Sequence, residues 1–437
     1  MLISLEEGRD NVENKDIYKA SRGAYIFEAA FEYFISMIIA GAFLAKLLTK
    51  TGISDQLTGI IASFVSLAYV SQFFSVLLIR PTKPVKKWVT LLTAIKSAFF
   101  VGLYMVPMLE VSQGIKTALV ILFILGGQLI SNIAMPFKTN WLMSLVDLRK
   151  RGAFTAKKEI ISLLGGMAFS YIMGALSDHY TNIGNDEMAF LICRITIVAL
   201  AILHIAMLII AREPEESQKV QEKSSLKEIL SMTLGNKTIR RIIYVNMLWT
   251  GVTHFSVSYF GVYQIKELGF SLTYVSIITI VSSFARIIFS RPLGRLADRT
   301  SWEHMMTICF GIAVVAYLAM GITAPANGKI MYMVYSVLYY ISMAGINSGL
   351  MNIVFDYADE KTRTAVLGIK TAIGGLCGFF TTIIGGWILG AVQKNGNQIF
   401  GITIYAQQLL AFITTIGLIL TIVYMRKVVH KMKRIGE

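Results

Sequence analysis

Long apolar stretches alternate with short polar ones along almost the whole chain. A helix needs about 20 mostly apolar residues to cross the ~30 Å hydrocarbon core of a bilayer. Stretches such as LLTAIKSAFFVGLYMVPML lack the strict alternation of barrel strands. The pattern therefore predicts an all-α integral membrane protein. Its twelve transmembrane helices are expected at residues 23–45, 56–79, 88–108, 117–146, 156–177, 188–211, 240–264, 271–290, 302–324, 330–355, 364–391 and 402–425.

Composition supports a membrane protein, because 55% of the residues are hydrophobic, only 15% are charged and the mean hydropathy is +0.62. Soluble domains carry about 25% charged residues. The expected surroundings are the lipid bilayer, and we expect a multi-pass protein of the plasma membrane.

The net charge of +15 raises the question of a nucleic-acid partner, and the positions of the basic residues answer it. The predicted loops on one side of the membrane hold few of them, namely Lys46, Lys50, Lys116, Lys266, Lys329 and Lys394. Most others lie in the tails and in the opposite loops, which the positive-inside rule places in the cytoplasm. Both termini are therefore expected to be cytoplasmic, and no nucleic-acid partner is expected.

The longest polar interruption, Arg212 to Arg241, divides the predicted helices into six and six. We predict an N-terminal bundle at residues 1–211, a cytoplasmic linker at 212–239 and a C-terminal bundle at 240–437. Weak repetition follows this division, since RGAFTAKK before the fifth helix aligns with RTAVLGIK before the eleventh. SVLLIR after the second helix aligns with GRLADR after the eighth. Duplicated halves are typical of transporters.

The polar stretch SRPLGRLADRTS, residues 290–301, is expected to form a turn between two helices. Its GRLADRT part resembles the loop between the second and third helices of each half in the major facilitator superfamily. That resemblance implies two pseudo-symmetric six-helix bundles and a cytoplasmic gate at Gly294, Arg295, Asp298 and Arg299. Gly294 is expected to permit close helix contact. In the first half Ser75 and Ile79 replace the glycine and the aspartate, so that gate is expected to be weaker. The alternative is that the turn only carries the positive-inside signal.

Motifs of catalysis are not found in the sequence. GITAPANGKI has the wrong glycine spacing for a phosphate loop, and neither HExxH nor GxSxG occurs. We therefore expect no enzyme activity, no cofactor and no metal site, and we expect an ion or solute gradient to supply the energy.

The first predicted helix carries a polar stripe, because Tyr25, Glu28, Glu32 and Ser36 recur at helical spacing. Two carboxylates one turn apart in a low dielectric disfavour the doubly charged state, so one of them could carry a coupling proton. Glu32, farther along the helix, is the preferred carrier, and Glu28 the preferred partner of Lys138. The alternative is a purely structural ion pair with Lys138 or Arg22.

In the major facilitator superfamily the first, fourth, seventh and tenth helices line the central cavity, and the resemblance implies that their polar residues bind substrate. These candidates are Tyr25, Gln128, Asn132, Lys138, Asn246, Trp249, Thr253, His254, Tyr339, Tyr340 and Asn347. Hydrogen bonding between helices is an equally good explanation for any one of them.

The sequence thus favours a secondary active transporter that takes up a small polar organic solute by alternating access. We expect coupling to a proton or another cation, and function as a monomer. Proton-coupled export of drug-like or cationic compounds is the alternative, although the predicted fifth helix, ISLLGGMAFSYIMGALSD, lacks the proline of many exporters in this family. A sensor or lipid-handling protein without solute flux is a third possibility.

Overall fold

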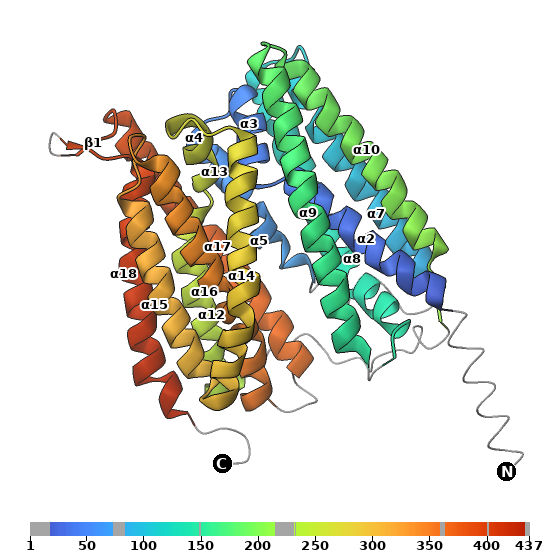
Figure 1. The fold of residues 1–437 in the computed structure, drawn as a ribbon, viewed down its shortest axis with the longest axis vertical. Coiled ribbons are helices and arrows are strands. Elements are labelled where there is room, and N and C mark those ends of the chain that lie inside the picture. The colour runs from blue at the N-terminus through green and yellow to red at the C-terminus, as the bar shows by residue number, and fades with distance from the viewer. Residues whose placement is uncertain are drawn as a thin grey trace, which may run out of the picture. The chain divides into compact units, whose positions relative to one another are not determined.

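A computed structural model describes residues 18–72, 84–147, 150–214, 231, 233–358, 363–399 and 402–432. The SVLLIR stretch, Lys83 and most of the predicted linker lie outside the described residues. The described elements are helices except for one antiparallel pair of two-residue strands, β1 (Gln398–Ile399) and β2 (Ile402–Thr403) (Figure 1).

Contacts divide the chain into two compact units, the first formed by residues 1–40 and 71–222 and the second by residues 41–70 and 223–437. The predicted division at residues 212–239 stays a prediction. The first unit contains the helices α2 (Lys19–Ile38), α7 (Val85–Leu103), η1 (Val106–Met108), α8 (Gln113–Ser144), α9 (Arg151–Asn182) and α10 (Asp186–Ile210). Within it, α2 packs against α9 and α10, and α7 packs against α8 and α10.

The second unit begins at Gly41, whose φ of +55° ends the preceding helix in the left-handed conformation that glycine adopts freely. Its N-terminal part holds α3 (Gly41–Lys50), α4 (Asp55–Ala62) and α5 (Phe64–Ala68). Its C-terminal part holds α12 (Lys237–Val257), α13 (Phe260–Val262), the π-helical turn η4 (Tyr263–Glu267), α14 (Leu272–Arg299), α15 (Trp302–Gly321), α16 (Gly328–Tyr357), α17 (Arg363–Lys394), α18 (Ala406–Lys427) and η5 (Val429–Lys431). α4 and α5 pack on α17, and α3 packs on α13.

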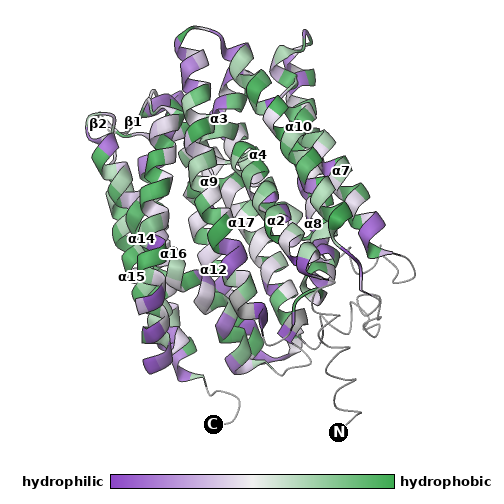
Figure 2. Cartoon of the chain, turned by 45° about the vertical axis from the view of Figure 1, so that its right-hand side comes forward, coloured by the Kyte–Doolittle hydropathy of each residue, from purple (hydrophilic) through white to green (hydrophobic). Residues whose placement is uncertain are grey.

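Eight of the described helices are long and apolar enough to cross a membrane, and α2 with α3 forms a ninth, bent candidate. Figure 2 shows hydrophobic residues along these helices, and many large apolar side chains are exposed, as expected for surfaces that contact lipid. α7 and α12 also correspond to predicted spans, and both carry basic residues, among them Lys96 and Arg240. α4 and α5 together form a shorter apolar segment.

The expectation of a turn at residues 290–301 is wrong, because α14 continues through this stretch to Arg299. Leu293 and Ala297, one helical turn apart, are both buried, and this burial favours continuation of the helix past Pro292. The expected close helix contact at Gly294 is not found among the described residues, because a Cβ there would meet none of their atoms within 4 Å. The chain reverses after Thr300. There the Ser301 hydroxyl accepts a hydrogen bond from the backbone N–H of His304 and caps the start of α15.

Glycines set the packing distance between α12 and α17 in the second unit. A Cβ at Gly385 would lie 2.2 Å from the carbonyl oxygen of Phe255, a backbone atom that cannot rotate away. Gly385→Ala should therefore destabilise the protein by about 1–3 kcal/mol, as overpacking does. Gly311→Ala is the matched control, because a Cβ at Gly311 meets nothing within 4 Å. Thermal unfolding in detergent should show a lower Tm for Gly385→Ala alone, and equal Tm values would contradict this account of the packing.

Candidate functional site

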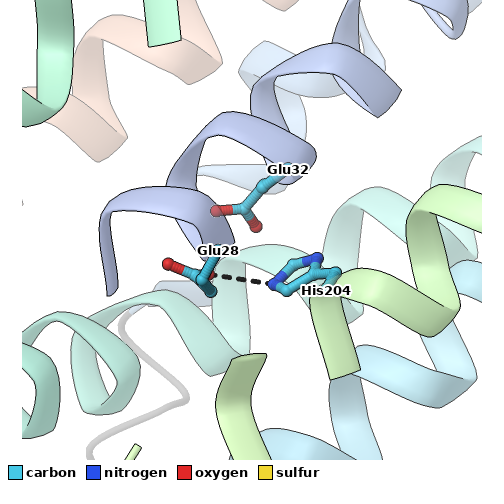
Figure 3. Close-up of side chains that lie close together, drawn as sticks. All are labelled: Glu28, Glu32 and His204. Atoms are coloured by element: carbon cyan, nitrogen blue, oxygen red, sulfur yellow. Dashed lines mark hydrogen bonds and ion pairs between the residues drawn. The ribbon is translucent and has the colours of Figure 1, made fainter. Parts of the chain in front are cut away.

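Five ionisable side chains meet inside the first unit, and they come from four different helices. Glu28 and Glu32 lie one turn apart on α2, Lys96 lies on α7, Lys138 on α8 and His204 on α10. Figure 3 shows both carboxylates and the imidazole directed toward one another. We call these five residues the charge cluster.

Ion pairs join the charge cluster into one chain of contacts. The Nζ of Lys138 lies 2.7 Å from Glu28 Oε1 and also contacts Oε2 of Glu32. The Nζ of Lys96 pairs with Oε1 of Glu32. At the other end, His204 Nε2 lies 2.9 Å from Glu28 Oε1. Each carboxylate therefore has two basic partners.

Burial differs sharply between the two carboxylates. The Glu28 side chain is 2% exposed and that of Glu32 is 28% exposed. The two lysines and His204 are buried. With both lysines and both carboxylates ionised, their four charges sum to zero, which is the condition under which buried charges are tolerated. Glu32 is thus the most exposed member of the cluster.

The ion pairs extend the expectations about the stripe on α2. Lys138 pairs with Glu28 as expected, and it also contacts Glu32, the more exposed of the two carboxylates. Lys96 and Lys138 thus compensate the like charges of the stripe. The sequence did not predict Lys96 and His204 as members of the cluster, because their partners are 64 and 176 residues away along the chain. Their one sequence signal is an ionisable group inside an apolar stretch.

The two ends of the stripe lie outside the charge cluster. The ring of Tyr25 packs against Phe154, and the Lys158 Nζ lies 4.8 Å from the ring centroid. The Ser36 hydroxyl donates a hydrogen bond to the Tyr33 carbonyl oxygen of its own helix. The charge cluster therefore includes only the middle of the stripe, Glu28 and Glu32.

Glu28, Glu32 and His204 also have the donor types of a metal site, with ligand atoms within 4.8 Å of one another. Lys96 and Lys138 already occupy their carboxylate oxygens. A divalent cation would have to displace two ammonium groups, so this arrangement suits ion pairing better than metal binding.

Asn132, an amide candidate of the first unit, makes two hydrogen bonds through its side chain. Gln72 Nε2 donates to Asn132 Oδ1 over 2.9 Å, and Asn132 Nδ2 donates to the backbone carbonyl oxygen of Gln128 over 3.0 Å. The first bond joins the end of the described segment 18–72 to α8, and the second lies within α8.

Aromatic candidates of the second unit form one continuous group. The rings of Trp249 and Tyr339 are stacked with centroids 6.4 Å apart, and Phe310 lies 5.6 Å from Trp249. Tyr339 also contacts Tyr335 and Tyr340. This group joins α12, α15 and α16.

Polar candidates in the same unit are separated by the fold. Asn246 Nδ2 donates to the carbonyl oxygen of Lys370, and the Thr253 hydroxyl donates to that of Trp249. Asn347 is exposed. The structure thus brings none of these three into the charge cluster or the aromatic group as a side-chain partner.

A cavity of about 290 Å³ lies in the second unit between α3, α4, α5, α12 and α13. Its polar lining residues are Thr58, Ser66, Tyr69, His254 and Ser258. His254 is the one substrate candidate from the sequence that lines it. The remaining walls are glycines and aliphatic side chains.

Hydrogen bonds fix the tautomer of His254. Its Nδ1 lies 3.0 Å from the carbonyl oxygen of Thr250, which can only accept, so Nδ1 carries the proton of the neutral ring. Nε2 is then an acceptor, and the Ser66 hydroxyl, 2.8 Å away, donates to it. The lone pairs of Ser66 Oγ stay available to a further donor.

An ion pair anchors the segment 41–70 to the C-terminal helices of the second unit. Asp55 Oδ1 lies 2.5 Å from Lys266 Nζ, and Asp55 Oδ2 accepts from Gln393 Nε2 over 2.9 Å. The carboxylate therefore joins α4 to η4 and α17.

The residues expected to form a gate lie in the last turns of α14. Arg295, Asp298 and Arg299 are exposed there, and Gly294 is half-buried. Their role as a gate stays a prediction.

Comparison with known proteins identifies the family. The family model of the Major Facilitator Superfamily matches residues 26–382, which is most of the chain. The chain belongs to the major facilitator superfamily. No curated protein sequence matches it. Membership of this family establishes that the chain is a multi-pass membrane protein. Its fold is that of a family of transporters, which are not enzymes.

Solved structures agree on the fold. A crystal structure of a mutant of the nucleoside transporter NupG matches with a TM-score of 0.72 and 12% identity, covering 93% of this chain and 99% of that one. A D-xylose-proton symporter matches with a TM-score of 0.68 and 12% identity, covering 94% and 97%. A bacterial homologue of the human lysosomal transporter Spinster, in an inward-facing and unoccupied conformation, matches with a TM-score of 0.62 and 13% identity. The match covers 94% of this chain and 95% of that one. Such low identities establish the fold alone.

Charge compensation makes a prediction about the stability of the first unit. Lys138→Met leaves Glu28 with His204 as its remaining partner among the described residues and should cost about 3–5 kcal/mol, the usual cost of stranding a buried charge. Adding Glu28→Gln removes the stranded charge, so the double variant should regain more than half of that loss. Thermal unfolding in detergent measures both.

The pH dependence of this deficit has a definite sign. Protonation neutralises the stranded Glu28, so the deficit of Lys138→Met should shrink as the pH falls. Lys237→Met, at an exposed position, is the control and should leave the Tm unchanged. A double variant less stable than Lys138→Met at every pH would contradict charge compensation.

Proposed function

We propose that this protein is a secondary active transporter that takes up a small polar organic solute by alternating access, driven by protons. The observation that carries the proposal is the charge cluster, a charge-balanced set of ionisable side chains inside apolar helices. Buried ionisable groups cost several kcal/mol in a membrane and are found where ions or protons are handled. The protein is proposed to act as a monomer in the plasma membrane, with both termini cytoplasmic.

Coupling follows from the unequal exposure of the two carboxylates. A proton can reach Glu32, which is partly exposed, and neutralising it weakens its pairs with Lys96 and Lys138. Lys138 then keeps Glu28 as its carboxylate partner, and Lys96 loses its own. Protonation thus shifts the charge balance between α2, α7 and α8, and any conformational equilibrium that these helices share shifts with it.

His204 is proposed to be a positioning residue for Glu28. Its Nε2 lies 2.9 Å from Glu28 Oε1, and the ring is fully buried. Glu28 is thereby held as the permanent partner of Lys138, while Glu32 exchanges protons.

The solute class is proposed from two sources. The similar structures include a nucleoside transporter and a D-xylose-proton symporter. The candidate residues outside the charge cluster are mostly amides, hydroxyls and aromatic rings, which suit neutral polar organic molecules. The alternative, export of cationic or drug-like compounds, is tested in the proteoliposome assay described next. An exporter would move its solute in the direction opposite to that of an uptake system under the same pH gradient.

Glu32→Gln should separate binding from coupling. Gln imitates the protonated carboxylate, so solute exchange should persist, whereas accumulation driven by a pH gradient should be lost. For one proton per solute, wild type accumulates solute up to about tenfold per pH unit, and the variant should stay near onefold. The measurement is uptake and exchange of labelled pentoses, hexoses and nucleosides in proteoliposomes.

Glu187→Gln is the matched control, because it makes the same chemical change at an exposed position on α10. It should accumulate solute like wild type. His204→Gln should shift the pH profile of accumulation and spare exchange. Full pH-driven accumulation by Glu32→Gln, Glu28→Gln and the double variant would eliminate proton coupling through the charge cluster.

Asp298 is proposed to act in a cytoplasmic gate at the end of α14, as the one acidic residue among Arg291, Arg295 and Arg299. Asp298→Asn should fold normally and slow transport several-fold by altering the balance of inward-facing and outward-facing states. Initial uptake rates in proteoliposomes test this, with size-exclusion profiles as the folding control. An uptake rate equal to that of wild type would contradict the gate and leave the charges of this stretch with the role of orienting the chain in the membrane.

A further inference from the structure

The cavity in the second unit has a size and a lining that restrict what can occupy it. From them we infer that it is a binding site for a neutral polyhydroxylated solute of monosaccharide size. The inference rests on the proposed function as a transporter, and it assigns a solute class and a place. The place differs from the expectation that the first, fourth, seventh and tenth helices together form the site, because α4 and α5 belong to the second predicted span.

Size sets the first limit. The volume of about 290 Å³ would hold roughly ten water molecules at ~30 Å³ each. An organic molecule with a similar number of non-hydrogen atoms fits, which describes a pentose or a hexose. A whole nucleoside has nearly twice as many such atoms, so the volume matches a monosaccharide more closely.

Charge sets the second limit. Among the described residues, no Asp, Glu, Lys or Arg side chain lines the cavity. The nearby carboxylate of Asp55 is already paired with Lys266 and Gln393. An ionised solute would therefore lose its hydration without gaining a counter-ion, which costs far more than moving a neutral polar molecule.

Hydrogen-bonding groups supply the third argument. Ser66 donates to His254 Nε2, so its oxygen can accept from a solute hydroxyl and extend a chain of hydrogen bonds to the imidazole. Thr58 is buried, and its hydroxyl has no hydrogen-bond partner within the part of the chain that the structure describes. Rotation about its Cα–Cβ bond can turn that hydroxyl toward a solute at no cost in existing bonds.

Apolar walls complete the match. Leu44, Val65, Val257 and Val262 line the cavity together with the ring of Tyr69. A sugar ring has C–H surfaces between its hydroxyls, and these can pack on aliphatic and aromatic side chains. A few fixed polar groups on mainly apolar walls are typical of small-molecule sites.

Two substitutions test the site without breaking an existing bond. Thr58→Val keeps the shape of the side chain and removes a hydroxyl that has no partner in the described residues, so the unliganded Tm should not fall. It should weaken D-xylose or D-glucose binding about threefold to tenfold, the worth of one hydrogen bond. Ala62→Phe fills the cavity and should weaken binding at least tenfold, with the unliganded Tm kept or raised.

Ser282→Ala is the control, because Ser282 is a buried serine of the same unit whose hydroxyl donates to Ser336 away from the cavity lining. It should bind sugar like wild type. The readout is the rise in Tm with ligand concentration for purified full-length protein in detergent, with D-xylose, D-glucose, uridine and tetraphenylphosphonium as separate probes. No pH gradient is present, so the result is independent of coupling.

Each outcome decides the inference. Saturable stabilisation by a sugar that both cavity variants weaken supports it. Sugar binding unchanged in Thr58→Val and Ala62→Phe overturns the location, and stabilisation only by uridine or tetraphenylphosphonium overturns the solute class. Failure of proton coupling leaves this binding intact and shows instead as absent pH-driven accumulation in wild-type proteoliposomes.

Discussion

The cost of placing charge in a low-dielectric interior governs the first unit. Two carboxylates on one face of α2 can be buried only because α7 and α8 each bring a lysine to them. The same pairs bind three helices to one another, so the charge balance and the packing of the unit are one constraint. A group that exchanges a proton within such a network changes both at once, which is why a partly exposed Glu32 beside an enclosed Glu28 suits coupling.

The second unit satisfies its buried polar groups in a different way. Hydroxyls, amides and carbonyls pair between helices, as in the contacts of Asn246 with Lys370 and of Tyr259 with Thr382. Glycines such as Gly385 let helix backbones approach closely, which is how helices associate where no water is available to drive hydrophobic packing. The cavity lies among these neutral contacts, and its character follows from them.

The two units thus contain different chemistry, because the first holds the charge cluster and the second holds a cavity whose described lining has no charged side chain. A proton needs a site whose charge can change, whereas a neutral solute needs fixed donors and acceptors and walls without charge. Under the two proposals, these requirements are met on separate sets of helices, so no charged group would impose its field on the neutral binding site.

The sequence by itself determined the helical, membrane-spanning character, because apolar length and 3.6-residue periodicity are local properties that need no partner. It also determined that Glu28 and Glu32 share a face of one helix, and the family of the chain. The sequence also suggested Lys138 as a partner of Glu28, but tertiary structure alone added Lys96 and His204, since these come from distant helices and no local pattern marks them as neighbours. It likewise decided that burial of Leu293 and Ala297 continues α14 through a stretch whose glycine, proline and charges favour a turn. Local propensity is settled within a few residues, whereas pairing and burial depend on which distant helices come to lie in contact.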